Sequence, residues 1–131
     1  AGSDPGWDLV STTGDLSITA TSGSTFTIKL VSLGLDNLAG QAANFTNTGN
    51  YSLKLASVAG SLTGFAANAF TVDASAFAND VNGGTWSVSN VGNDLFLNFT
   101  ASAIPEPSTY ATILGALALA CTAIRRRRRA A

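Results

Sequence analysis

The strongest constraint on this chain is an uncharged segment that runs into a block of arginines near the C-terminus. Residues 108–124 contain no charged side chain and are mostly Ala, Leu and Ile. As a helix these 17 residues would be about 25 Å long, at the short end of the usual membrane-spanning range of about 17–25 residues. The arginines that follow are Arg125, Arg126, Arg127, Arg128 and Arg129. Because each charge costs about 3 kcal/mol at the centre of a bilayer, they act as a membrane stop. The sequence therefore predicts a single C-terminal transmembrane helix over residues 108–124, held in the lipid bilayer.

The charge distribution gives this helix an orientation. Residues 1–104 carry seven Asp against two Lys, a net charge of −5, whereas residues 105–131 carry five Arg against one Glu, a net charge of +4. By the positive-inside rule the arginines stay in the cytoplasm and residues 1–104 lie on the outer side of the membrane. We therefore divide the chain into an exported part, 1–104, and a tail, 105–131. An arginine block can also bind nucleic acid, but its apolar neighbour and the acidic part before it argue against a nucleic-acid partner.

A short motif stands directly before the apolar segment and consists of Pro105, Glu106 and Pro107. A Pro-Glu-Pro tripeptide, a short Ala- and Leu-rich span and a terminal arginine cluster, in this order, resemble the PEP-CTERM sorting signal of Gram-negative bacteria. The resemblance covers residues 105–131 and implies one partner, a membrane protease of the exosortase type that removes the span after export. It also implies a location: the bacterial inner membrane before processing, with the N-terminal part outside the cytoplasm, and the cell surface or extracellular space afterwards.

The exported part has the pattern of short, half-buried β-strands. Apolar and polar residues alternate with a period of two in five runs, at 25–30, 51–55, 70–73, 86–89 and 95–99. Twelve of the 13 Gly lie in this part, often between those runs, where they are typical of turns. The segment Trp86–Phe99 predicts a hairpin with Asn90–Asn93 at its tip. A helical turn near Asp73–Asn79 is the one exception to a β pattern.

About a hundred residues of short strands predict an all-β fold, either a β-sandwich or the end and cap of a β-solenoid. The stretch from Gly6 to Ile18, together with the segment from Gly83 to Trp86, is similar to the C-terminal ends of bacterial proteins with autotransporter-associated β-strand repeats. That resemblance implies the last coils and cap of a longer β-helix. The sequence shows no internal repeat of constant period, however, and this argues against an extended solenoid in this piece.

The residue inventory argues against catalysis. The chain has no His, which removes the commonest general base and the commonest metal ligand. Its one Cys, Cys121, lies inside the predicted span. Most of the seven Asp are next to Gly or Asn, where Asp commonly closes turns, and no D-x-D-x-D pattern gathers them for calcium. We expect no catalytic residue, no cofactor and no bound metal, and a protein that is not an enzyme.

Two functions of different classes remain open. The first is an exported structural protein of the cell envelope or extracellular matrix, and the second is a surface adhesin or glycan-binding module on the same β scaffold. Trp7 and Trp86 could form a sugar-stacking platform, but the phase that Trp86 shares with Val88 favours a core position for Trp86. Further partners on these hypotheses are an exopolysaccharide or a second copy of the chain, because few charges protect the edge strands from pairing.

Overall fold

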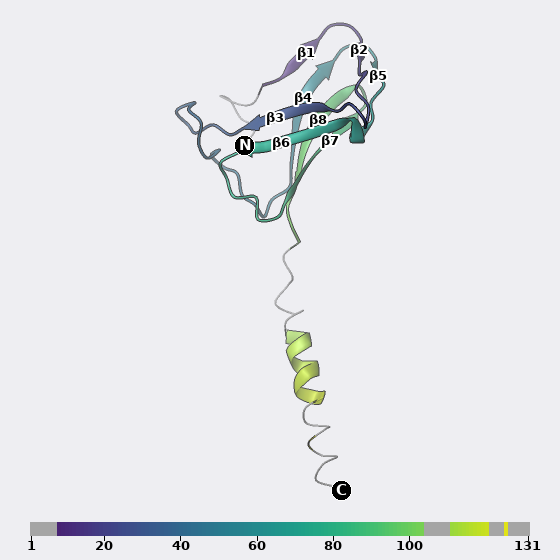
Figure 1. Ribbon diagram of the computed structural model, residues 1–131. Coiled ribbons are helices and arrows are strands. Elements are labelled where there is room, and N and C mark those ends of the chain that lie inside the picture. Colours follow the sequence, from purple (N-terminus) through teal and green to yellow (C-terminus); the bar gives the residue numbers. More distant parts are fainter. Residues whose placement is uncertain (1–7, 104–110, 121–124, 126–131) are drawn as a thin grey trace.

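The computed structural model describes residues 8–103, 111–120 and 125. Its described part is mostly β-strand with one short helix, so the prediction of an all-β fold for the exported part is confirmed (Figure 1). The strands are β1 (Val10–Thr12), β2 (Leu16–Ser17), β3 (Phe26–Val31), β4 (Tyr51–Val58), β5 (Leu62–Thr63), β6 (Phe70–Ala76), β7 (Thr85–Val91) and β8 (Asp94–Thr100). They form one four-stranded sheet, in the order β1-β4-β8-β7, and two small sheets, β2-β5 and β3-β6.

The first six strands repeat one path through the molecule twice. Strand β1 pairs with β4, β2 with β5 and β3 with β6, and all three pairs are parallel. The partners are 46 residues apart in the first two pairs, as in Val10 with Ala56 and Leu16 with Leu62. In the third pair Phe26 faces Phe70, and the register then shifts between Lys29 and Val31. Residues 9–40 therefore form a first turn, and residues 51–78 form a second turn stacked on it.

This stacking brings together two similar segments of the sequence. The segment LVSTTGDLS at 9–17 aligns with LASVAGSLT at 55–63 at an offset of 46 residues. The identical pairs are Leu9 with Leu55, Ser11 with Ser57, Gly14 with Gly60, and Leu16 with Leu62. The similarity extends over only nine residues, and the offset of 46 residues occurs only once along the chain. For this reason the sequence shows no repeat of constant period. Two stacked turns do not make a closed solenoid. The described residues therefore do not form the β-solenoid that was one of the two predicted folds.

The hairpin predicted between Trp86 and Phe99 is confirmed as β7 and β8. Its strands pair without irregularity from Thr85 with Thr100 to Val91 with Asp94. Gly92 begins the two-residue turn with a φ of 60°, a conformation that glycine adopts without steric cost. Strand β8 also pairs antiparallel with β4, so the hairpin covers the side of β4 opposite to β1.

The core lies where the second turn meets this hairpin. The buried apolar side chains are Ala56, Val58, Ala69, Val88, Leu95, Leu97 and Phe99. On β8 burial alternates strictly, with Leu95, Leu97 and Phe99 facing inward, as the period of two predicts. All seven residues belong to the second turn or the hairpin. The first turn contributes none of them, although it does hold the buried Ser32.

One local expectation is wrong. Residues 73–79 do not form a helical turn, because β6 continues through Ala76 in parallel pairing with β3. Ladder hydrogen bonds and burial outweigh the helix propensity of its Ala residues. The described residues of the exported part, 8–103, are called the β part below. The short helical turn that they do contain is the 3-10 helix η1 (Ala67–Ala69), just before β6.

Candidate functional site

The tail carries the strongest functional signal. Residues 111–120 are helical and every one of them is exposed (Figure 1). Among the described residues, no helix combines the length and the apolar character that crossing a membrane requires. Residues 108–110 and 121–124 of the predicted span lie outside the described residues, as do Pro105, Glu106, Pro107 and the arginines at 126–129. Arg125 is helical and exposed.

A hydrogen bond fixes the end of the β part shortly before this tail. Strand β8 ends at Thr100, and the backbone N–H of Ala101 donates to Oδ1 of Asn50 at 2.9 Å. Asn50 directly precedes β4, the central strand on which β8 pairs. The chain therefore leaves the sheet next to its central strands, and the last described residue before the tail is Ala103.

Five aromatic residues from the segment between the two turns, the second turn and the hairpin form one cluster: Phe45, Tyr51, Phe77, Trp86 and Phe99. Ring centroids are 4.9 Å apart for Trp86 and Phe99, and 5.2 Å apart for Trp86 and Phe77. Phe45 lies between the other rings, stacked on Tyr51 at 5.1 Å and edge-on to Phe99 at 5.0 Å. Trp86 is half-buried and packs in this cluster, and its interpretation as a core residue stays a prediction. Its Nε1 atom is buried without a hydrogen-bond partner, and Trp7 lies outside the described residues.

Half of the six described Asp side chains act as local acceptors. Three of them accept a backbone N–H two residues ahead, which closes a turn: Asp36 from Leu38, Asp73 from Ser75, and Asp80 from Asn82. Asp15 instead links the two turns, since its Oδ1 accepts the backbone N–H of Ser61 at 2.7 Å. Within the described ranges, no group of three or more His, Cys, Asp or Glu comes together.

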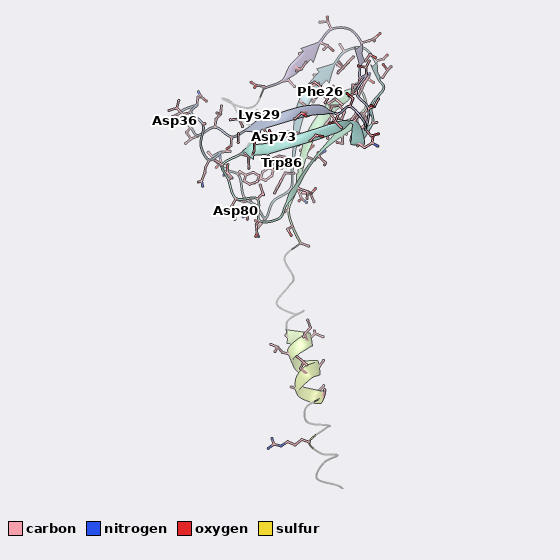
Figure 2. All side chains as sticks on the ribbon, in the orientation of Figure 1. Phe26, Lys29, Asp36, Asp73, Asp80 and Trp86 are labelled. Atoms are coloured by element: carbon pink, nitrogen blue, oxygen red, sulfur yellow. The ribbon has the colours of Figure 1, made fainter. Side chains whose placement is uncertain are left out.

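The fold lowers the pKa values of two described carboxylates, those of Asp73 and Asp94. The hydroxyl and the backbone N–H of Ser75 hold the pKa of Asp73 below its usual range, and the Lys29 ammonium on the neighbouring strand lowers it further (Figure 2). The Lys54 ammonium has the same effect on the pKa of Asp94. Both carboxylates stay ionised near neutral pH, which suits structural pairs rather than proton donors.

Comparison with known proteins identifies the tail. Residues 103–129 match the family described as the PEP-CTERM protein-sorting motif. The predicted sorting tail is therefore found, and motifs of this class are recognised by exosortase, a membrane protease. No curated protein and no solved structure matches the chain, and the resemblance of residues 1–104 to autotransporter-associated β-strand repeat proteins gains no support.

Sequence reasoning did not predict that seven large apolar side chains of the first turn are exposed, among them Phe26 and Val31, which have opposite phase on β3. The 46-residue offset is the sequence signal for the stacking of residues 9–17 on residues 55–63.

Proposed function

We propose that this protein is an exported structural component of the bacterial cell envelope or extracellular matrix, sorted and cleaved through its C-terminal tail. The observation that carries the proposal is the PEP-CTERM match at residues 103–129, which begins just after the last strand of a folded β part ends at Thr100. A protease that cuts beyond Ala103 would release that β part intact, with every described strand retained.

The residues of the tail suit sorting at the membrane followed by cleavage. Pro105 and Pro107 disfavour both helix and sheet, because each lacks a backbone N–H and restricts the residue before it. The motif should therefore remain extended between the β part and the span, within reach of a protease at the membrane surface. The exposed, uncharged helix at 111–120 and the arginines from Arg125 onward would hold the chain at a fixed depth until the cut.

The same proposal holds that the released part is not an enzyme. It is supported by the absence of His from the sequence and by the use of the described Asp side chains to close turns and link strands. The packing of Trp86 inside an aromatic cluster gives no specific support to an adhesin or glycan-binding role. We therefore propose the structural role.

Fractionation of a host that contains an exosortase tests the sorting step. The wild-type chain should appear outside the inner membrane as a shortened product. The double variant Pro105→Ala/Pro107→Ala should remain in the membrane at full length, because each Pro→Ala change favours helix by about 3 kcal/mol and lets the helix extend through the motif. The control is Pro5→Ala, a change of the same type far from the tail, which should be released like wild type. Equal release of all three proteins would contradict the proposal.

A glycan array probed with the released product tests the structural role. The proposal predicts no specific glycan bound by the β part. Saturable binding to one glycan class, lost on Trp7→Ala, would favour the adhesin instead.

A further inference from the structure

Asn82 is the one asparagine of the sequence that is followed by glycine. Asn82 and Gly83 are the central residues of a tight turn between β6 and β7, with φ values of 45° and 75°. The backbone N–H of Gly84 donates to the carbonyl of Val81 at 2.7 Å and closes this turn. Two central residues of positive φ are the pattern of a type I′ turn, for which Asn-Gly is a preferred pair. Asn82 and Gly83 are both exposed to solvent.

The atoms of this pair that could react with each other are not held by other groups. Among the described residues, neither the side-chain amide of Asn82 nor the backbone N–H of Gly83 makes a hydrogen bond. The hydrogen bond that Asn82 does make comes from its backbone N–H, which donates to Oδ1 of Asp80 at 2.9 Å (Figure 2). By contrast, both polar atoms of the Asn79 side chain bind the backbone of Ala42, at 2.7 and 3.1 Å.

An asparagine amide beside such a backbone nitrogen can lose ammonia. After hydroxide removes its proton, the Gly83 nitrogen attacks Cγ of Asn82, and the new N–Cγ bond closes a five-membered succinimide. The Cγ–Nδ2 bond breaks, and Nδ2 leaves as ammonia with a proton from water. A second water then adds to one of the two ring carbonyls and breaks its bond to the ring nitrogen, which gives aspartate or isoaspartate. Because Gly83 has no Cβ, its nitrogen approaches without steric hindrance.

We propose that Asn82 is a modification site, at which the folded chain deamidates through a succinimide with Gly83 and acquires a carboxylate. The attack requires rotation about the Cα–C bond of Asn82, which opens the turn. Pairing of β7 with β8 begins after the turn, at Thr85 with Thr100, so the rotation leaves the ladder intact. Water is the one co-reactant, and the reaction therefore does not depend on the proposed sorting.

Asn37 shows why exposure and backbone conformation are not sufficient for this reaction. Asn37 is exposed and has a φ of 60°, much like Asn82. The residue that follows it is Leu38, whose backbone N–H donates to Oδ1 of Asp36 at 3.1 Å. A carboxylate that accepts this N–H opposes the loss of its proton, and the leucine side chain crowds the nitrogen. Asn37 should therefore keep its amide, which makes it a control within the same molecule.

The turn at Asn82 lies beside the segment that leads out of β8. A Cβ at Gly83 would lie 3.7 Å from Cβ and Oγ of Ser102, and a Cβ at Gly84 would collide with the Phe99 ring. The match to the sorting motif begins one residue after Ser102, at residue 103. Deamidation adds a negative charge two residues from Asp80, and the isoaspartate product also lengthens the main chain of the turn by one methylene. The modification should therefore loosen the turn that packs at the start of the tail.

Peptide mapping by mass spectrometry tests the proposal on the full chain, kept in a non-ionic detergent and incubated in water labelled with a heavy oxygen isotope. The label marks carboxylates that form during the incubation, and digestion at acidic pH avoids further reaction during mapping. The test variant is Gly83→Ala. The control is Gly92→Ala at the hairpin tip, a change of the same type at a glycine with a φ of 60°. Near-UV circular dichroism establishes that each variant is folded.

We expect labelled aspartate and isoaspartate at position 82 of the wild-type chain, formed faster at mildly alkaline than at mildly acidic pH. The rate at Asn82 should exceed the rate at Asn37 at least about tenfold, a difference in barrier of about 1.4 kcal/mol. Gly83→Ala should lower the rate at Asn82 at least about tenfold, whereas Gly92→Ala should change it less than about twofold.

Two results for the wild-type chain overturn the proposal: Asn82 keeps its amide throughout the incubation, or it reacts no faster than Asn37. An unchanged rate at Asn82 in folded Gly83→Ala also overturns it, because the attacking nitrogen would then not be the one in Gly83. If Gly83→Ala does not fold, the comparison of Asn82 with Asn37 in the wild-type chain decides the matter.

Discussion

The Nζ atom of Lys54 lies 2.7 Å from Oδ2 of Asp94, and this ion pair joins the second turn to the first residue of the last strand. Oδ1 of the same carboxylate accepts the backbone N–H of Val58 at 3.1 Å. Asp94 thus binds the side chain of Lys54 in the middle of β4 and the backbone of Val58 at the end of β4. The register of β4 against β8 shifts between Lys54 and Ala56, and the carboxylate spans this irregularity.

The first prediction concerns the pH dependence of this pair. The hydrogen bonds from Lys54 and Val58 hold the pKa of Asp94 below its ordinary value of 3.8, so the folded state favours the carboxylate. The resulting stability is present above that pH and is lost as the pH falls through the lower pKa of the folded state. Thermal unfolding followed by circular dichroism should show a lower midpoint for Asp94→Asn than for wild type at pH 7.

The same experiment in acid tests whether the ionised carboxylate of Asp94 is the cause of this difference in stability. The difference between Asp94→Asn and wild type should shrink as the pH falls below 3.8 and through the lowered pKa of Asp94, where the carboxylate becomes protonated. Lys54→Gln should begin to lose stability at a higher pH than wild type, because the pKa of Asp94 rises without the ammonium. A constant difference between Asp94→Asn and wild type from pH 7 to pH 2 would show that this pair does not control acid stability.

The second prediction concerns the contact between the two turns at Gly64. Gly64 has a φ of 73°, and a Cβ at this position would collide with the backbone carbonyl of Ile18 in the turn above. Gly92 has a similar φ of 60° with no atom within 4 Å of its Cβ position. Gly92→Ala should therefore cost about 1–2 kcal/mol of unfolding free energy, the usual penalty of a left-handed alanine. Gly64→Ala should cost clearly more, as measured by urea unfolding, and equal losses would mean that the turns are not stacked as described.

The third prediction concerns the position of the core. Leu97 is 2% exposed between β4 and β7, whereas Leu35 is 85% exposed. Leu97→Ala should lower the unfolding free energy by about 2–5 kcal/mol, because it removes buried methyl groups and leaves a cavity. Leu35→Ala should change it by less than about 0.5 kcal/mol at concentrations where the protein is monomeric. A small effect at Leu97 would place the core elsewhere.

Much of this fold is predictable from local alternation. The runs at 25–30, 51–55, 70–73, 86–89 and 95–99 all lie in strands except for Thr25, because a period of two directly reports a half-buried pleated surface. The pairing is harder to predict, since parallel partners 46 residues apart leave no local mark. The strands β2 and β5 are two residues each and too short for a periodic signal. The sorting motif was predictable because its three elements follow one another directly in the sequence.

The exposure of Phe26 shows the opposite limit of sequence reasoning. Phe26, Ile28 and Leu30 share one phase, which predicts that all three face the interior. Only the structure shows that Phe26 contacts the Phe70 ring at 6.2 Å and is still 59% exposed. A side chain's phase on a strand is local information, whereas the presence of a covering layer depends on the topology.

The fourth prediction concerns the orientation of the unprocessed chain. An alkaline phosphatase reporter, active only outside the cytoplasm, is fused after residue 131. The positive-inside rule predicts no reporter activity there and full activity when the same reporter is fused after Ala103. Strong activity of the fusion after residue 131 would reverse the predicted topology.

The central claim is that the tail is a sorting signal which is removed, and the intact mass of the released protein tests it most directly. The protein is expressed in a bacterium with an exosortase, purified from the extracellular fraction and measured by mass spectrometry without prior digestion. The account predicts a mass that retains residues through at least Ala103, the last described residue of the β part, and lacks residues 108–131. A released chain whose mass still includes the arginines and ends in Ala131 would contradict it.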